Sequence, residues 1–232
     1  GAVSKTSADD AERELRAILA EHPDYARAWG GLAVVLWARS LDVREEREAW
    51  RIKAEDAARE AMARDPKQPD ADAVLANLAC REGRWEECLS RLERAVRQAP
   101  SDTQWRTWYA QRLATAGYLG KAMAQLDIAE AIDPLSGDVA FFRVRLLDTL
   151  GRHDEAGRIL KDYPRTSQAT QYFNAIWRRD YAEARRLAAS LPAEDRWRAP
   201  ELAAVEALQD PQRWPAVMAL IDDQIPFLML IR

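Results

Sequence analysis

The sequence predicts an all-α protein built as a stack of antiparallel helix pairs, and three observations carry this prediction. Prolines recur at a fixed spacing, because Pro66, Pro100 and Pro134 are 34 residues apart. Stretches with a helical spacing of apolar residues lie between these prolines. A constant period of this length is the signature of a repeat architecture. Glycines in polar turn sequences recur with the same period: Gly83, Gly117 and Gly151.

The prolines mark the end of one helix in each unit. A helix-like segment precedes each of them, such as CLSRLERAVRQA before Pro100 and AMAQLDIAEAID before Pro134. Proline lacks the N–H that would continue a helix, and it disfavours the helical conformation of the residue before it. Pro23 precedes Pro66 by 43 residues, which is one period plus an insertion of nine. We predict that the insertion, within residues 41–50, extends a solvated helix end; a partner-specific protrusion is the less favoured alternative.

Each unit therefore consists of a first helix, a glycine turn, a second helix and a proline. Small residues such as Ala76 and Cys88 let the two helices approach closely, while Leu75 and Leu92 fill the space between them. One helix pair cannot bury its apolar face alone, so neighbouring pairs must stack on one another. Full units begin at four positions: Ala26, Pro69, Thr103 and Gly137.

Composition narrows the classes of function. The chain has 232 residues, of which 48% are hydrophobic and 31% charged, so it can bury a sizeable core. Its longest apolar stretches, 28–38 and 225–231, are shorter than the ~20 residues of a membrane span, and no signal peptide is visible. The net charge of −4 argues against nucleic acid as the direct partner. With two His and two Cys, we expect no metal, no cofactor and no enzymatic activity.

Two consecutive units share one pattern of residue types. The first unit has Leu75, Ala76, Gly83, Cys88, Leu92, Ala95 and Pro100. The next has Tyr109, Ala110, Gly117, Ala122, Leu126, Ala129 and Pro134. This order resembles the tetratricopeptide repeat (TPR) family, and the resemblance extends over about residues 10–164. It implies a right-handed superhelical solenoid that acts as a protein-interaction scaffold, with a peptide or helix held in its concave groove.

The pattern weakens towards both ends. Residues 10–22 are predicted to form a lone helix, 166–192 a degenerate fifth unit, and 197–208 with 214–223 a last helix pair. We therefore assign residues 1–194 to the repeat array and 195–232 to degenerate capping helices. The apolar C-terminal segment IPFLMLIR, 225–232, is predicted to pack as a cap or to mediate self-association into a homo-oligomer. A purely structural oligomerisation module is thus one alternative function.

Two segments resemble a narrower group of proteins. HPDYARAWGGLA, 22–33, and DPLSGDVAFFRVRLLDTLGRHDEA, 133–156, are similar to the C-terminal repeat region of bacterial winged-helix regulators. These regulators are the cadaverine-operon-activator-like, adenylate-cyclase-like proteins. The resemblance implies a second alternative, the sensory module of a membrane-tethered transcription regulator. It also implies a soluble bacterial chain, in the cytoplasm or the periplasm.

The concave face of such an array is lined mainly by the first helix of each unit. Counting positions two, five, nine and twelve of these helices, together with neighbouring aromatic residues, gives the predicted peptide-binding set: Arg27, Trp37, Asn77, Gln104, Thr107, Trp108, Gln111, Phe141, Arg145, Phe173 and Trp177. Asn77, Gln111 and Arg145 recur at intervals of 34 residues, and amides offer both a donor and an acceptor to a peptide backbone. The alternative is that these are solvated polar positions on an open face.

Three further residue sets narrow these predictions. A carboxylate clamp of the TPR type is not expected, because Gly30 and Ala73 stand where lysine is needed. Cys80 and Cys88 lie eight residues apart across a turn, and we expect two unbonded thiols with Cys88 as a buried small residue; a disulfide is the less favoured alternative. Four tryptophans are predicted to fill spaces between helices: Trp50, Trp105, Trp197 and Trp214.

Overall fold

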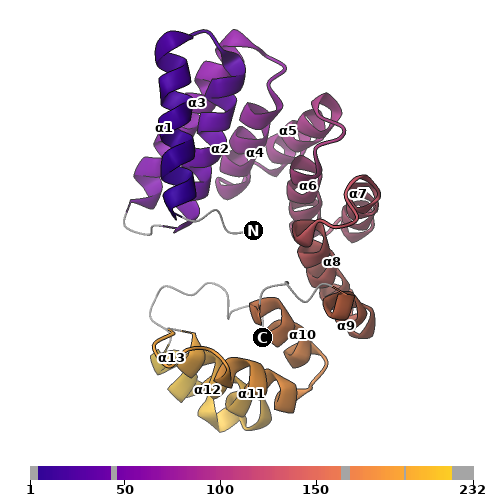
Figure 1. Cartoon of the computed structure of the whole chain (residues 1–232). Coiled ribbons are helices and arrows are strands. Elements are labelled where there is room, and N and C mark those ends of the chain that lie inside the picture. The colour runs from indigo at the N-terminus through magenta and orange to yellow at the C-terminus, as the bar shows by residue number, and fades with distance from the viewer. Residues whose placement is uncertain (1–4, 43–45, 163–167, 196, 221–232) are drawn as a thin grey trace. The chain divides into compact units, whose positions relative to one another are not determined.

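The computed structural model of the protein describes residues 5–42, 46–162, 168–195 and 197–220. Within these ranges the regular structure is helical throughout, which confirms the predicted all-α class. The chain divides into two compact units, Gly1–Phe142 and Arg143–Arg232. Figure 1 shows the helices of both units.

Unit 1 consists of a lone first helix and successive antiparallel pairs. Its helices are α1 (Lys5–Glu21), α2 (Ala26–Asp42), α3 (Arg47–Arg64), α4 (Pro69–Arg81), α5 (Trp85–Gln98), α6 (Thr103–Thr115) and α7 (Leu119–Ile132). The pairs α2–α3, α4–α5 and α6–α7 make extensive contacts. The first helices of the units begin at the predicted positions, and the insertion lengthens α2 and α3 on either side of residues 43–45, which lie outside the described residues.

Glycine occupies a left-handed position in the three turns where the repeat pattern predicted it. Gly83, Gly117 and Gly151 have φ angles of 78°, 86° and 73°. At the first of these turns the Gly83 N–H donates to Cys80 O and the Arg84 N–H to Ala79 O. A residue with a side chain is sterically disfavoured in this conformation, so the recurrence of glycine has a direct structural cause.

Helix α4 lies at the centre of unit 1 and packs on α2, α3, α5 and α6. Four alanines make this close approach possible: Ala71, Ala73, Ala76 and Ala79, all fully buried. A larger side chain at these positions would separate the helices, because protein interiors are already close-packed. The small residues thus set the distance between successive pairs.

Two links fasten α4 to α5. Near the start of α4, the buried Asp72 accepts from Arg94 Nε at 2.6 Å and from Arg91 Nη1 at 3.1 Å. Near its end, Cys80 and Cys88 form a disulfide with a Cα–Cα distance of 5.2 Å. The expectation of two unbonded thiols is therefore wrong. The turn at Gly83 brings the last turn of α4 and the first turn of α5 together, which a separation of eight residues alone does not reveal.

Unit 2 continues with shorter helices. α8 (Gly137–Thr149) contains the boundary between the units, and it is followed by α9 (His153–Asp162), α10 (Gln168–Trp177), α11 (Tyr181–Ala189), α12 (Arg198–Gln209), the short 3₁₀ helix η1 (Pro211–Arg213) and α13 (Trp214–Leu220). The buried Tyr172 of α10 packs with Val205 of α12, and its hydroxyl donates to Glu201 O at 2.9 Å. The predicted fifth unit thus corresponds to α10–α11 and the last pair to α12–α13.

The predicted domain boundary at 194/195 falls inside unit 2 and stays a prediction about repeat organisation. The C-terminal segment 225–232, predicted to be a cap or an oligomer contact, lies outside the described residues. Among the predicted space-filling tryptophans, Trp105 is buried between helices, whereas Trp50 and Trp214 are partly buried against their clusters. In the described part of the chain no helix is long and apolar enough to cross a membrane.

Removing the disulfide should destabilise unit 1. Cross-linking residues eight apart restricts the unfolded chain, and loop-closure entropy assigns about 2–3 kcal/mol to a loop of this size. We expect C80A/C88A, and the wild-type protein in a thiol reductant, to unfold at lower urea concentration than the oxidised protein. A wild-type urea transition that does not respond to the reductant would contradict the disulfide, and the double variant controls for effects of the reductant itself.

Glu201 should make the stability of unit 2 depend on pH. Burial raises the pKa of this carboxyl from its ordinary value of 4.5 to about 7, and Asp195 adds to the shift. Because the folded state holds the proton more tightly than the unfolded chain, the stabilisation is present below pH 4.5 and is lost as the pH rises through about 7. Melting temperatures across this window should fall more steeply for wild type than for E201Q. The exposed-site variant E194Q serves as the control, and parallel wild-type and E201Q curves would refute the assignment.

Candidate peptide-binding face

The predicted contact residues of unit 1 include an accessible group and a buried group. Arg27 and Gln104 are exposed and Gln111 is partly exposed, so these three side chains are accessible. Trp37, Asn77 and Thr107 are 4%, 1% and 2% exposed, so their side chains are occupied within the fold. The second group is buried because α4 packs on four other helices, which cover part of the stripe that was predicted to face outward.

Two tryptophans that were predicted to contact a peptide, Trp37 and Trp108, pack in or against the apolar core. Trp37 belongs to the apolar cluster around α2, α3 and α4, and the partly buried Trp108 packs against that cluster and the next. The Trp108 ring also meets Trp105 edge to face, with ring centroids 5.0 Å apart. The Thr107 hydroxyl donates to Thr103 O one turn earlier in its own helix. Both tryptophans therefore contribute to the packing of unit 1.

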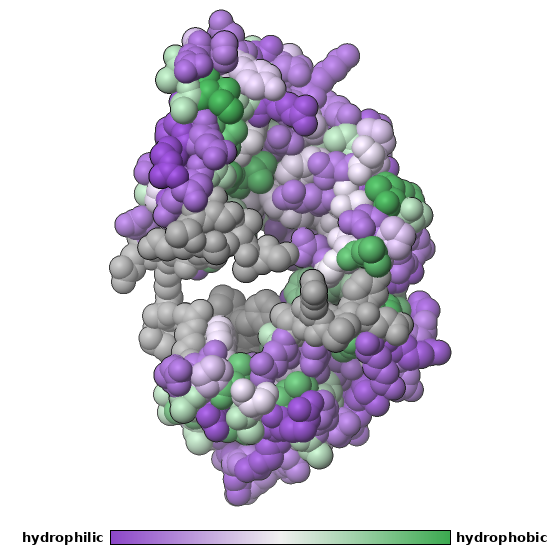
Figure 2. Space-filling model, viewed as in Figure 1, coloured by the Kyte–Doolittle hydropathy of each residue, from purple (hydrophilic) through white to green (hydrophobic). Residues whose placement is uncertain are grey.

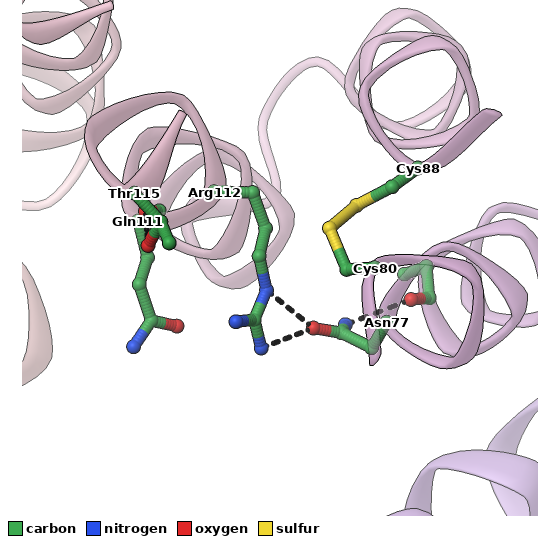
Figure 3. Close-up of a disulfide and its surroundings, with 7 residues drawn as sticks. Asn77, Cys80, Cys88, Gln111, Arg112 and Thr115 are labelled. Atoms are coloured by element: carbon green, nitrogen blue, oxygen red, sulfur yellow. Dashed lines mark hydrogen bonds between the residues drawn. A yellow bond between two sulfur atoms is a disulfide. The ribbon is translucent and has the colours of Figure 1, made fainter. Parts of the chain in front are cut away.

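Asn77 links two successive first helices. Its Nδ2 donates to Ala73 O at 2.9 Å, which fixes the amide orientation. Its Oδ1 accepts two hydrogen bonds from Arg112 of α6, from Nε at 2.9 Å and from Nη2 at 2.7 Å. Figure 3 shows this contact, with the disulfide close to Asn77 on α4. Asn77 therefore positions Arg112, and the arginine is the more accessible member of the pair.

The sequence prediction missed Arg112 by one position. It lies 35 residues after Asn77, one repeat period plus one residue, whereas the predicted stripe passed through Gln111. A small rotation of α6 about its axis decides which of two adjacent residues reaches α4. The sequence could have indicated this contact through the arginine itself, because a planar guanidinium group can donate two hydrogen bonds to one amide oxygen.

Arg112 is a partly desolvated cation. Burial lowers its pKa, and the nearby Arg81 guanidinium lowers it further, although arginine keeps its charge at neutral pH. Arg51 of α3 shows the same two effects, burial first and Arg81 second, and Glu48 is its ion-pair partner. Among the described residues, Arg112 and Arg81 have no carboxylate within ion-pair distance, so this end of α4 carries uncompensated positive charge.

Opposite charge lies at the other end of the same helices. Burial raises the pKa of Asp70, Asp102 raises it further, and Arg27 acts in the opposite direction. The two carboxylates and Arg27 are therefore close enough to influence one another near the start of α4 and α6. Gly30 stands where a carboxylate clamp would need lysine. It faces this region, since an added Cβ would lie 2.9 Å from Gln68 Cδ.

The remaining predicted residues lie in other surroundings. Phe141 of unit 1 meets Phe142 edge to face, with centroids 5.0 Å apart. In unit 2, burial lowers the pKa of Arg145, while Phe173 packs edge to face on Tyr172. Trp177 is exposed and stacks on His153. The eleven predicted residues are divided between the two units: Arg145, Phe173 and Trp177 belong to unit 2, and the other eight to unit 1.

A metal centre finds no support in the described ranges. They contain no group of three or more His, Cys, Asp or Glu side chains that could hold an ion. The α4–α6 face is formed by Asn77 and Arg81 of α4 and by Gln111 and Arg112 of α6. These side chains are amides and guanidinium groups, which donate hydrogen bonds. This chemistry suits a ligand with carbonyl or carboxylate oxygens.

Comparisons with known proteins agree with the fold. Residues 52–111 match the tetratricopeptide repeat family. Among solved structures, one from the functional characterisation of pilF of Pseudomonas aeruginosa has a TM-score of 0.54 at 17% identity, covering 94% of this chain and 91% of that chain. The fold is of the TPR type. A comparison with curated proteins finds no match.

Two further structures support the same fold. A tetratricopeptide repeat protein from Parabacteroides merdae has a TM-score of 0.57 at 19% identity, with 80% of this chain and 75% of that chain covered. A thermophilic TPR protein of Thermus thermophilus has a TM-score of 0.57 at 16% identity, with 80% of this chain and 96% of that chain covered. At these identities the likeness concerns the fold and leaves the binding residues to be argued from this chain.

The Asn77–Arg112 contact should be visible as an energetic coupling. N77A leaves the Arg112 guanidinium partly desolvated without its acceptor, which should cost about 1.5–3 kcal/mol of unfolding free energy. R112M removes the charge, so N77A/R112M should lose less than the sum of the two single variants. Urea titrations of the four proteins measure this difference. Q111A should change stability by less than about 0.5 kcal/mol, and strictly additive losses would contradict the contact.

Proposed function

We propose that this protein is an interaction scaffold that binds an extended peptide segment or a helix of a protein partner on the α4–α6 face. The TPR-type fold supports a protein-binding role. The observation that carries the assignment to this face is Arg112, a partly desolvated guanidinium held by a neutral amide with no carboxylate partner among the described residues. A charge left in this state gains more from a partner's oxygen than a fully hydrated charge does.

Recognition on this face would depend on polar donors. Arg112 uses Nε and one of its N–H groups at Nη2 to bind Asn77, which leaves its Nη1 group for a ligand. Gln111 lies beside it on α6 and offers both a donor and an acceptor (Figure 3). An extended chain presents alternating carbonyl and amide groups, so the pair can bind its backbone while Arg81 attracts an acidic side chain.

The platform beneath these groups is already fixed. Asn77 is buried, its amide is bonded to its own helix, and the disulfide ties the end of α4 to α5. Binding then costs little ordering of the receptor, which is the benefit of preorganisation. On the side of the molecule shown in Figure 2, apolar residues form small separate patches within a mostly polar surface.

The scaffold role needs no chemistry of its own, and the partner defines its biological effect. The two alternatives, a sensory module of a winged-helix regulator and a homo-oligomerisation module, rest on the sequence alone. The segment 225–232 on which the oligomer hypothesis depends lies outside the described residues. We therefore base the proposal on the α4–α6 face.

Peptide selection tests this proposal. A displayed library of random peptides is selected on the immobilised wild-type protein and, in parallel, on Q111A/R112Q. We expect wild type to enrich peptides that contain acidic residues, and the double variant to bind them about tenfold or more weakly, since each lost bond to a charged group costs about 1.5–3 kcal/mol. R97Q, on the exposed side of α5, is the matched control. Peptides that bind the double variant as well as wild type would place the binding surface elsewhere.

A further inference from the structure

A cavity of about 1240 Å³ opens on unit 2. It lies where the turn before α9 meets the turn between α10 and α11, and Leu208 of α12 also lines it. Its lining combines aromatic rings with several guanidinium groups, including Trp177, Arg158 and Arg179. All lining residues belong to unit 2, so the cavity is complete within one compact unit.

Arg179 occupies the turn position that is glycine in the three preceding helix pairs, at Gly83, Gly117 and Gly151. Its φ is 58°, and it is the one residue other than glycine with positive φ in the described part of the chain. The Arg179 N–H donates to Ile176 O and the next N–H, of Asp180, to Ala175 O, which repeats the bonds at Gly83 and Arg84. The left-handed conformation costs a residue with a side chain roughly 1 kcal/mol. An arginine kept in a strained position suggests a use for its side chain.

The aromatic wall of the cavity is held rigidly. The His153 and Trp177 rings are nearly parallel, with an interplanar angle of 8° and centroids 5.9 Å apart. His153 Nδ1 lies 3.1 Å from Asp148 Oδ1, and Asn174 Nδ2 donates to the same oxygen at 2.9 Å. Trp177 nevertheless remains 43% exposed, so part of its ring is free to contact a ligand.

The charges around the cavity are unbalanced. Arg152 pairs with Glu155 at 2.6 Å, and Arg178 lies 3.7 Å from Asp154. Arg158 and Arg179 also line the cavity, and in the described part of the chain no carboxylate lies within ion-pair distance of either. Glu155, which binds Arg152, is also within electrostatic reach of Arg158. Two unpaired guanidinium groups beside an exposed indole are complementary to carboxylates next to an apolar group.

We propose that this cavity is a second binding site, for an acidic peptide segment that carries a large apolar side chain. The apolar side chain packs against Trp177, and the flanking carboxylates pair with Arg158 and Arg179. The site differs from the α4–α6 face in its residues and its unit, so each site can be tested without the other.

The probe is the peptide acetyl-Glu-Glu-Phe-Glu-Glu-amide, titrated to about 5 mM against ¹⁵N-labelled full-length protein. The Trp177 indole signal, assigned with W177F, reports binding. The informative variant is R179G, which relieves the positive φ and should therefore raise the melting temperature of unit 2 while removing the charge. R185Q, an exposed arginine of α11 outside the cavity, changes net charge equally and is the matched control.

We expect the acidic peptide to shift the Trp177 indole signal, and R179G to weaken binding about tenfold while R185Q leaves it unchanged. The peptide acetyl-Lys-Lys-Phe-Lys-Lys-amide should leave the signal in place. Absence of a shift with the acidic peptide, an equal response to the basic peptide, or wild-type affinity in R179G would each overturn the proposal. A loss of binding confined to Q111A/R112Q would assign the peptide to the α4–α6 face instead.

Discussion

Close packing around α4 is the constraint on which the rest of unit 1 depends. Four fully buried alanines let four other helices approach this helix, and no larger residue would leave the distances unchanged. Because α4 is enclosed on so many sides, its polar residues must be satisfied inside the protein. Asp72 accepts hydrogen bonds from two arginines of α5, and Asn77 accepts them from Arg112 of α6.

Buried polar contacts of this kind also set the register between successive first helices. In unit 1 the contact is Asn77 with Arg112, and in unit 2 the buried Asp148 of α8 accepts from Asn174 of α10. Apolar packing alone tolerates small sliding movements, whereas a buried donor or acceptor without its partner costs free energy. Each contact also leaves a neighbouring group accessible at the surface: Gln111 beside the first and Trp177 beside the second.

The sequence predicted the helices well because the period, the glycines and the prolines act locally. The first helices of the units begin where the repeat predicted, and the turn glycines have the left-handed conformation that explains them. The residues of the candidate site were harder to predict, because a small rotation of α6 decides whether Gln111 or Arg112 reaches α4. The disulfide was missed because its formation depends on how two helix ends meet in space. Arg179 was missed because it breaks the glycine pattern that revealed the other turns.

The central claim is that the α4–α6 face is the surface that contacts a partner. The most direct test places a photo-reactive amino acid at position 111 on α6, or at position 93 on the exposed side of α5, and irradiates the protein in extract of its own cells. The claim predicts a cross-linked partner from position 111 that is lost when Arg112 is replaced by glutamine, with none from position 93. Adducts that form equally from both positions, or from position 93 alone, would contradict it.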